Sequence, residues 1–383
     1  MGQRSDKMLR SPHFMRGMSL PEILAAVLIG LIGMIVIMQV YATSEERKRT
    51  TTGTSDAQIN GNIAMFTLES TMRSAGFGMV SASNNMLGCT TLAYNSNRAT
   101  PDFTYLMAPV VITVGAAGAP DSITVAYGSS PNVVEGNPFV SSAASGADIP
   151  LKNAAGILVG DLVVSSETGL NCSMAEVTGF VPAAINTVMH ATAAAYSYVN
   201  AAGYTISPTA TYNKGGGSGV NYSSSALLYT LGRAPTVVTY RIDPIGRDKL
   251  QTRTLMPYVA AQDADGDGTS DADIGDGIVQ LKALYGMDKN CDGVVDTWDN
   301  IITPPVVPPC AISLNPWMQV RAIRVALLAR SGKFEKTAVT PAAPAWTGGA
   351  FTMTNPADGT DWRFYRYRVY ETIVPLRNMI WSN

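Results

Sequence analysis

The sequence predicts an α+β fold in which a long N-terminal helix packs on an antiparallel β-sheet domain with long loops. Three observations lead to this prediction. Residues 23–41 form an uncharged, almost entirely apolar run. A helical pattern of apolar residues continues beyond it until Gly76 and Gly78. From residue 79 onward, short β-prone runs such as 110–115 and 236–243 alternate with Gly-, Pro- and Asn-rich segments.

The composition of the 383-residue chain argues against several classes of function. A net charge of −2 and the lack of a basic block disfavour nucleic-acid binding. The chain has only two histidines, His13 and His190, so neither a catalytic triad built on histidine nor a multi-histidine zinc site is expected. The four cysteines form no C-x-x-C pair, which disfavours a zinc ribbon or a redox motif. We therefore expect a protein that is not an enzyme.

The apolar run at 23–41 has the length of a membrane span. Its only polar side chain is Gln39. A helix over these residues rises about 28 Å, close to the thickness of the bilayer hydrocarbon. A buried core helix is the alternative, but core helices usually carry a polar stripe. We expect a single membrane span.

The helical pattern beyond the span is amphipathic. Ile59, Ile63 and Phe66 follow one another at helical spacing, and the neighbouring face carries Met65, Leu68 and Met72. We expect these residues together to form an apolar stripe that packs on the sheet.

One carboxylate lies at the start of the predicted membrane helix, in the sequence Arg16-Gly17-Met18-Ser19-Leu20-Pro21-Glu22. A carboxylate within the bilayer is costly and needs a partner. If the chain is cut after Gly17, Glu22 becomes the fifth residue, and the new α-amino group of Met18 in a neighbouring subunit can pair with it. A helix-start role for Glu22, complementing the macrodipole, is the alternative.

This segment resembles the class III leader of type IV prepilins, which is short and basic, ends in Gly and is followed by Glu at mature position five. The runs 19–41, 56–79 and 366–381 also resemble PilW-type minor pilins. The resemblance implies cleavage between Gly17 and Met18 by the prepilin peptidase, N-methylation of Met18 and a pilin-like fold. The domain organisation expected is a leader at 1–17, a hydrophobic and amphipathic helix at 18–75, a variable β-rich region at 76–260, Asp-rich loops at 261–310 and C-terminal strands at 311–383.

The resemblance also implies a function. It indicates a minor pilin that acts in type IV pilus assembly and priming at the inner membrane and at the filament tip. The expected partners are other minor and major pilins, the prepilin peptidase and the inner-membrane assembly platform. The expected location is a single pass of the inner membrane with a periplasmic globular domain, followed by the pilus at the cell surface. A type II secretion pseudopilin and a calcium-dependent pilus-tip adhesin are the alternatives.

An exported domain lies where disulfides persist. The four cysteines allow three pairings. We favour Cys291–Cys310, which closes a short Pro-rich loop, together with Cys89–Cys172.

Ten of the chain's 29 acidic residues lie between 263 and 299, and this density of charge predicts a bound cation. The segment 288–299 places oxygen-bearing residues at positions 1, 3, 5, 9 and 12 of an EF-hand-type calcium loop, with Gly293 at position 6 for the sharp turn. The expected Ca²⁺ ligands are Asp288, Asn290, Asp292, the backbone carbonyl of Val294, Asp296 and Asp299. The last is Asp where an EF-hand has Glu.

The segment 263–274 repeats the pattern less completely. Its expected ligands are Asp263, Asp265, Asp267 and Asp271. Position 12 is Ile274, so Asp273 or Asp276 would have to complete the site. The alternative for both segments is a pair of solvated Asp/Gly turns.

Overall fold

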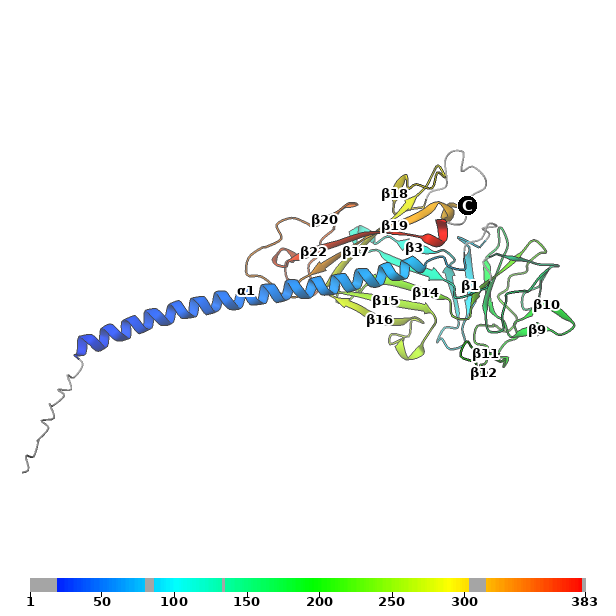
Figure 1. The fold of residues 1–383 in the computed structure, drawn as a ribbon, viewed down its shortest axis with the longest axis horizontal. Helices are drawn as coiled ribbons and strands as arrows, with labels where there is room; N and C mark the ends of the chain where they lie inside the picture. Colours follow the sequence, from blue (N-terminus) through cyan, green and yellow to red (C-terminus); the bar gives the residue numbers. More distant parts are fainter. Residues whose placement is uncertain (1–18, 80–85, 133–134, 303–314, 381–383) are drawn as a thin grey trace, which may run out of the picture. The chain divides into compact units, whose positions relative to one another are not determined.

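The computed structural model describes residues 19–79, 86–132, 135–302 and 315–380 (Figure 1). The chain divides into two compact units, Met1–Gly53 and Thr54–Asn383. The helix α1 (Leu20–Ser74) runs through both units, and its residues up to Gly53 belong to the first unit. The apolar side chains between Leu20 and Tyr41 are exposed. The predicted long N-terminal helix is therefore present.

The second unit contains a six-stranded sheet near its middle. Its strands, in spatial order, are β2 (Asp102–Leu106), β1 (Thr90–Tyr94), β8 (Cys172–Glu176), β7 (Leu162–Ser166), β13 (Leu227–Gly232) and β5 (Asn137–Pro138). The β1–β8 pair is parallel. This corrects the expectation of a purely antiparallel domain, because the chain reaches β8 only after a long excursion through β3 to β7.

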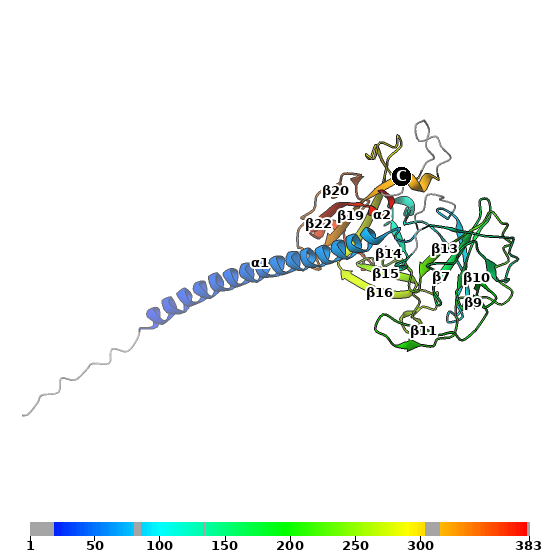
Figure 2. The same ribbon diagram turned by 45° about the vertical axis from the view of Figure 1, so that its right-hand side comes forward.

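Smaller sheets lie beside this one. One has the order β6 (Ile149–Pro150), β10 (Ala184–Met189) and β9 (Gly179–Val181), and another pairs β11 (Tyr198–Val199) with β12 (Thr205–Ile206). Figure 2 shows β9 and β10 beside β7 and β13. Phe139, Val163, Val188 and Leu228 bury their side chains in a common core here. The variable middle of the chain therefore has a hydrophobic core of its own.

Two larger antiparallel sheets complete the second unit. The five-stranded sheet has the order β16 (Ser270–Asp276), β15 (Lys249–Met256), β14 (Thr236–Ile242), β4 (Ser122–Tyr127) and β3 (Val110–Thr113). The four-stranded sheet has the order β18 (Thr297–Asp299), β17 (Ile278–Met287), β19 (Val320–Arg330) and β22 (Tyr367–Pro375), and a hairpin pairs β20 (Ala345–Trp346) with β21 (Gly349–Ala350). The strand β19 is rich in Val, Leu and Ala and is buried on both faces, as expected of a central strand.

Short helices connect these strands. They are the 3₁₀ turns η1 (Ala116–Gly118), η2 (Ala260–Gln262), η3 (Pro316–Gln319) and η4 (Trp362–Phe364), and the C-terminal helix α2 (Arg377–Ile380).

The second half of α1 docks on the sheets through its small and long apolar residues. Ala64, Met65, Leu68 and Met72 are buried in the main core. By contrast, the face formed by Ile59, Ile63 and Phe66 is exposed, with Phe66 at 73%. The expectation that both faces pack on the sheet was therefore wrong for the face of Ile59, Ile63 and Phe66. The side of the helix that faces the sheet carries Ala and Gly, because the Tyr370 side chain of β22 lies close to it.

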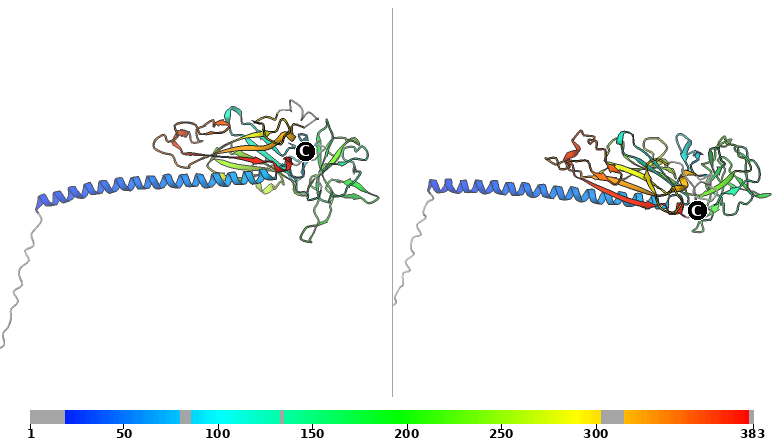
Figure 3. Two further views of the ribbon diagram at one scale, coloured as in Figure 1. Left: turned by 45° about the horizontal axis from the view of Figure 1, so that its top comes forward. Right: turned by 90° about the horizontal axis from the view of Figure 1, so that it is seen from above.

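Polar contacts fix the same part of α1. The hydroxyl group of Tyr370 in β22 lies 3.1 Å from the Gln58 carbonyl oxygen, and its ring covers Gly61, where a Cβ would overlap it. Figure 3 shows the red strand β22 running alongside this part of the helix. The Nδ2 of Asn378 donates to the Ser74 and Ala75 carbonyls at 3.3 and 2.9 Å, satisfying acceptors at the helix end.

Candidate functional site

The start of α1 contains the candidate processing segment. Gly17 and Met18 lie outside the described residues. Glu22 is in the first turn, and its Oε2 accepts hydrogen bonds from the Ser19 backbone N–H at 3.1 Å and the Ser19 hydroxyl at 3.2 Å. A Glu three residues after a Ser N-cap can form half of a capping box in this way. Sequence reasoning missed Ser19, although the S-x-x-E spacing was legible.

The first half of α1 is long and apolar enough to cross a membrane. This segment, Leu20–Lys48, is the one candidate span within the described residues. It begins at the capped turn of Ser19 and Glu22. The geometry places a single acidic side chain at the N-terminal edge of the span.

The two Asp-rich segments fold into loops with the same internal hydrogen bonds. In the first, the Gly268 N–H donates to Asp263 Oδ2 at 2.9 Å, and the Asp267 N–H donates to Asp265 Oδ1 at 3.2 Å. In the second, the Gly293 N–H donates to Asp288 Oδ2 at 3.0 Å. The Asp292 N–H likewise donates to Asn290 Oδ1 at 3.0 Å. Both glycines have positive φ, +83° and +87°, which favours Gly at the sharp turn.

Strands, and not helices, hold the second loop. It follows β17 directly, and β18 then pairs back on β17, with Asp299 opposite Tyr285. The element that leads into the loop is therefore the strand β17 and not a helix. The loop resembles an EF-hand loop in its residue pattern while lying in a β-hairpin.

The first loop brings three carboxylates together. One carboxylate oxygen from each of Asp263, Asp265 and Asp267 lies within 4.8 Å of the others. Desolvation opposes ionisation of Asp263, but hydrogen bonds from the Tyr258 hydroxyl and the Gly268 amide outweigh it and lower the pKa of Asp263. These three side chains therefore lie close together, and calcium binding by them stays a prediction.

Two arginines also lie at the first loop. Arg253 forms ion pairs with Asp267 and, at 3.5 Å, with Asp271. Arg98 packs its guanidinium group against Gly268. One of the two carboxylates proposed to complete the site is engaged elsewhere, since Asp273 in β16 contacts Lys249 at 3.1 Å and Gln251 at 2.9 Å. Guanidinium groups therefore already neutralise part of this loop.

The second loop contains a fully buried carboxylate. Asp288 pairs with Arg321, whose Nε lies 3.2 Å from Oδ2, and Arg321 in turn donates to the Met379 carbonyl at 2.9 Å. Asp292 and Asp296 are exposed, and both accept hydrogen bonds from Asn290 Nδ2 at 3.2 Å. Val294 is exposed, and Asp299 lies at the end of β18.

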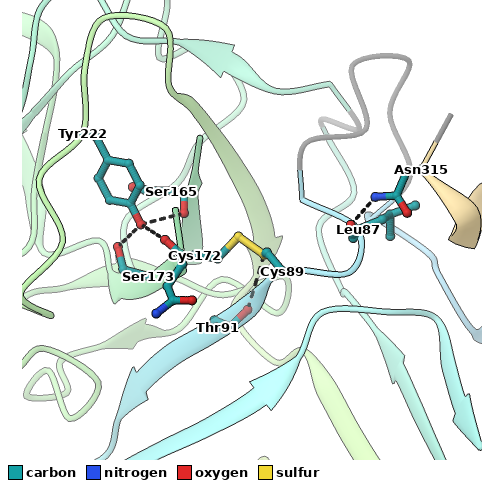
Figure 4. Close-up of a disulfide and its surroundings, with 9 residues drawn as sticks. Leu87, Cys89, Thr91, Ser165, Cys172, Ser173, Tyr222 and Asn315 are labelled. Carbon is teal, nitrogen blue, oxygen red and sulfur yellow. Dashed lines mark hydrogen bonds between the residues drawn. A yellow bond between two sulfur atoms is a disulfide. The ribbon is translucent and has the colours of Figure 1, made fainter. Parts of the chain in front are cut away.

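A disulfide joins Cys89 to Cys172, as predicted, with their Cα atoms 5.8 Å apart (Figure 4). It ties the entry of β1 to β8, beside the parallel pair. The Tyr222 hydroxyl lies within hydrogen-bond distance of the Ser165 and Asn171 carbonyls and the Ser173 hydroxyl. Burial raises the pKa of Tyr222 to about 12. Cys310, the partner predicted for Cys291, lies outside the described residues, so that pairing stays a prediction.

A cavity of about 440 Å³ lies near this disulfide and was not foreseen from the sequence. Its lining includes Phe103, Tyr222, His190 and the ion pair of Lys214 with Asp102, which is 2.8 Å long. A ring nitrogen of His190, Nε2, lies 2.8 Å from the Ala147 carbonyl oxygen. The histidine therefore holds a loop on the wall of the cavity.

Residues 240–378 match the family model for type IV pilus-assembly protein W (PilW). The match runs from β14 through both Asp-rich loops to α2 and supports involvement in type IV pilus assembly. The comparisons with curated proteins and with solved structures found no match.

Proposed function

We propose that the protein is a minor pilin subunit that acts in type IV pilus assembly and priming at the inner membrane and the filament tip. The observation that carries this proposal is the match of residues 240–378 to the PilW family. The apolar segment Leu20–Lys48 supports it, because a pilin subunit needs a membrane-length helix before it enters a filament.

Processing at the N-terminus belongs to the same proposal. The prepilin peptidase cleaves between Gly17 and Met18, and Met18 becomes the methylated first residue. Glu22 then pairs with the new α-amino group of a neighbouring subunit. What supports this role is the position of Glu22 in the first turn of α1, directly ahead of a long apolar segment.

The proposed location is a single pass of the inner membrane with the second unit in the periplasm, and then the pilus at the cell surface. The Cys89–Cys172 disulfide supports an oxidising compartment for the second unit.

The proposed partners are other minor and major pilins and the inner-membrane assembly platform, and the proposed role is one of contact, without catalysis. The exposed face of Ile59, Ile63 and Phe66 supports contacts with neighbouring subunits. These residues continue the helix that would pack in a filament, and a patch of large apolar side chains on the surface favours protein contact.

The test is Glu22→Ala in cells that carry the pilus system. We expect membrane insertion to be unchanged, because the apolar segment is intact, and surface pili to be strongly reduced. Glu45→Ala, an exposed carboxylate on the same helix, is the matched control and should leave piliation normal. Pili and insertion are measured by filament shearing and by membrane fractionation.

Normal piliation in the Glu22→Ala strain would contradict the proposal. Loss of protein secretion with intact pili would indicate a type II secretion pseudopilin instead. Mass spectrometry of the purified N-terminus should find N-methylated Met18 as the first residue.

A further inference from the structure

The buried carboxylate of Asp288 has one oxygen without a protein partner. Its Oδ2 contacts the Gly293 N–H and Arg321 Nε, whereas Oδ1 is buried and has no hydrogen-bond partner within the described part of the chain. Buried polar atoms are normally satisfied, because losing water without a replacement costs free energy. Because Oδ2 binds the Gly293 amide, the carboxyl group of Asp288 is fixed at the start of the loop. An orphaned carboxylate oxygen at this place is a ready cation ligand.

Two exposed carboxylates of the loop, Asp292 and Asp296, share a neutral side-chain donor in addition to the backbone N–H groups that they accept from. The Asn290 amide nitrogen donates to Asp292 Oδ2 and to Asp296 Oδ1. Within the described residues, neither Asp292 nor Asp296 forms an ion pair. One amide therefore bridges two negative charges that repel each other, at the place where a cation would interact with both far more strongly.

We propose that residues 288–299 bind one calcium ion. The ligands are Asp288 through Oδ1, the side chains of Asn290, Asp292, Asp296 and Asp299, and the backbone carbonyl of Val294. This proposal does not depend on a role in the pilus.

The chemistry of the donors selects calcium. All six donors are oxygen atoms, which hard cations prefer, whereas transition metals favour nitrogen and sulfur ligands. Calcium accepts six to eight oxygens in flexible geometry, and magnesium requires a near-ideal octahedron. Asp299 has a shorter side chain than the Glu of an EF-hand, so we expect an affinity in the range of extracellular sites, with a Kd of about 0.1–1 mM.

The first Asp-rich loop shares one feature with the second, since Asp263 Oδ1 is also buried without a hydrogen-bond partner in the described part of the chain. The two loops differ in the cations beside them. In the first loop, Arg253 contacts Asp267 and Asp271, which occupy the positions of Asp292 and Asp296 in the second loop. A guanidinium group therefore takes the role that we assign to the ion. Asp267→Asn is consequently a matched control for Asp292→Asn, since both change position 5 of otherwise similar loops.

The experiment uses the full chain in detergent micelles. The protein is first treated with a chelator and then titrated with CaCl₂ from about 0.01 to 10 mM, a range that brackets the expected affinity. Thermal unfolding is followed by tryptophan fluorescence, and binding is measured directly by calorimetry. MgCl₂ and NaCl at matched ionic strength control for screening of surface charge.

We expect CaCl₂ to raise the Tm by about 2–4 °C at saturation, because an ion that binds only the folded state stabilises it. Asp292→Asn and Asp296→Asn should weaken calcium binding at least about tenfold, and Asp267→Asn should leave it unchanged. Both ligand residues are exposed, so these variants should fold.

Three results would overturn the proposal. The first is a wild-type chain that neither binds nor responds to CaCl₂. The second is unchanged binding in both Asp292→Asn and Asp296→Asn. The third is loss of binding in Asp267→Asn, which would move the site to the first loop. None of these results bears on piliation.

Discussion

Tyr222 shows how a single buried hydroxyl can organise the middle of the chain. It lies 2.9 to 3.1 Å from three oxygen atoms on the elements around β7 and β8, close to the Cys89–Cys172 disulfide. Desolvation raises the pKa of Tyr222, which keeps the hydroxyl protonated and able to donate. This side chain therefore links segments that are distant in sequence.

Tyr222→Phe should lower the free energy of unfolding by about 1–2 kcal/mol, because it leaves buried acceptors without a donor. Chemical denaturation of the full chain in detergent measures the change. Tyr204→Phe is the matched control, since Tyr204 is 70% exposed and should be neutral. Equal stability of the Tyr222→Phe and wild-type proteins would show that the hydroxyl contributes nothing.

At the scale of elements, the second half of α1 has two faces with different roles. Leu68 is fully buried against the sheets, whereas Phe66, two residues earlier, is largely exposed. The two faces can therefore be tested separately.

Leu68→Ala should lower the free energy of unfolding by about 2–5 kcal/mol, because it leaves a cavity in the main core. Phe66→Ser should change it by no more than about 0.5 kcal/mol, as is usual for exposed positions. If the exposed face contacts other pilins, Phe66→Ser should nevertheless reduce piliation. Piliation equal to wild type in a stable Phe66→Ser protein would remove this face from the proposed interface.

The sequence predicted the elements better than it predicted their packing. The long helix, the strands β3 and β14 and the turns of both Asp-rich loops follow from local patterns of apolar, Gly and Asp residues. Hydrophobicity alone suggested that Ile59 and Ile63 would be buried. The structure buries Ala57 and Gly61 on the opposing side, because the Tyr370 ring approaches the helix too closely for a larger residue.

The features that the sequence did not predict depend on contacts between segments that are distant in the chain. Arg253 reaches Asp267 and Asp271 because β15 pairs with β16, and Arg321 reaches Asp288 because β19 pairs with β17. Neither arginine is adjacent to its loop in the sequence, so spacing within the loops could not reveal them. The parallel β1–β8 pair and the cavity beside it likewise depend on tertiary packing.

At the scale of the whole molecule, the Cys89–Cys172 disulfide closes a long segment of the second unit. The two cysteines are 83 residues apart, and the segment between them contributes strands to three sheets. Cross-linking a long segment limits the conformations of the unfolded chain, which favours the folded state.

The double substitution Cys89→Ser and Cys172→Ser should therefore lower the free energy of unfolding by about 2–4 kcal/mol. Denaturation of the variant and of the wild type, with and without reductant, measures it. Reductant should destabilise the wild type more than the variant. A wild-type protein that is no more stable than the double variant would contradict the prediction.

The end of α1 depends on residues near the end of the chain. Asn378 donates hydrogen bonds to the carbonyls of Ser74 and Ala75, and Tyr370 donates one to the carbonyl of Gln58. During translation, the residues of α1 are synthesised hundreds of residues before Tyr370 and Asn378. These contacts of α1 can therefore form only when translation is nearly complete, and a subunit truncated before Tyr370 would lack them.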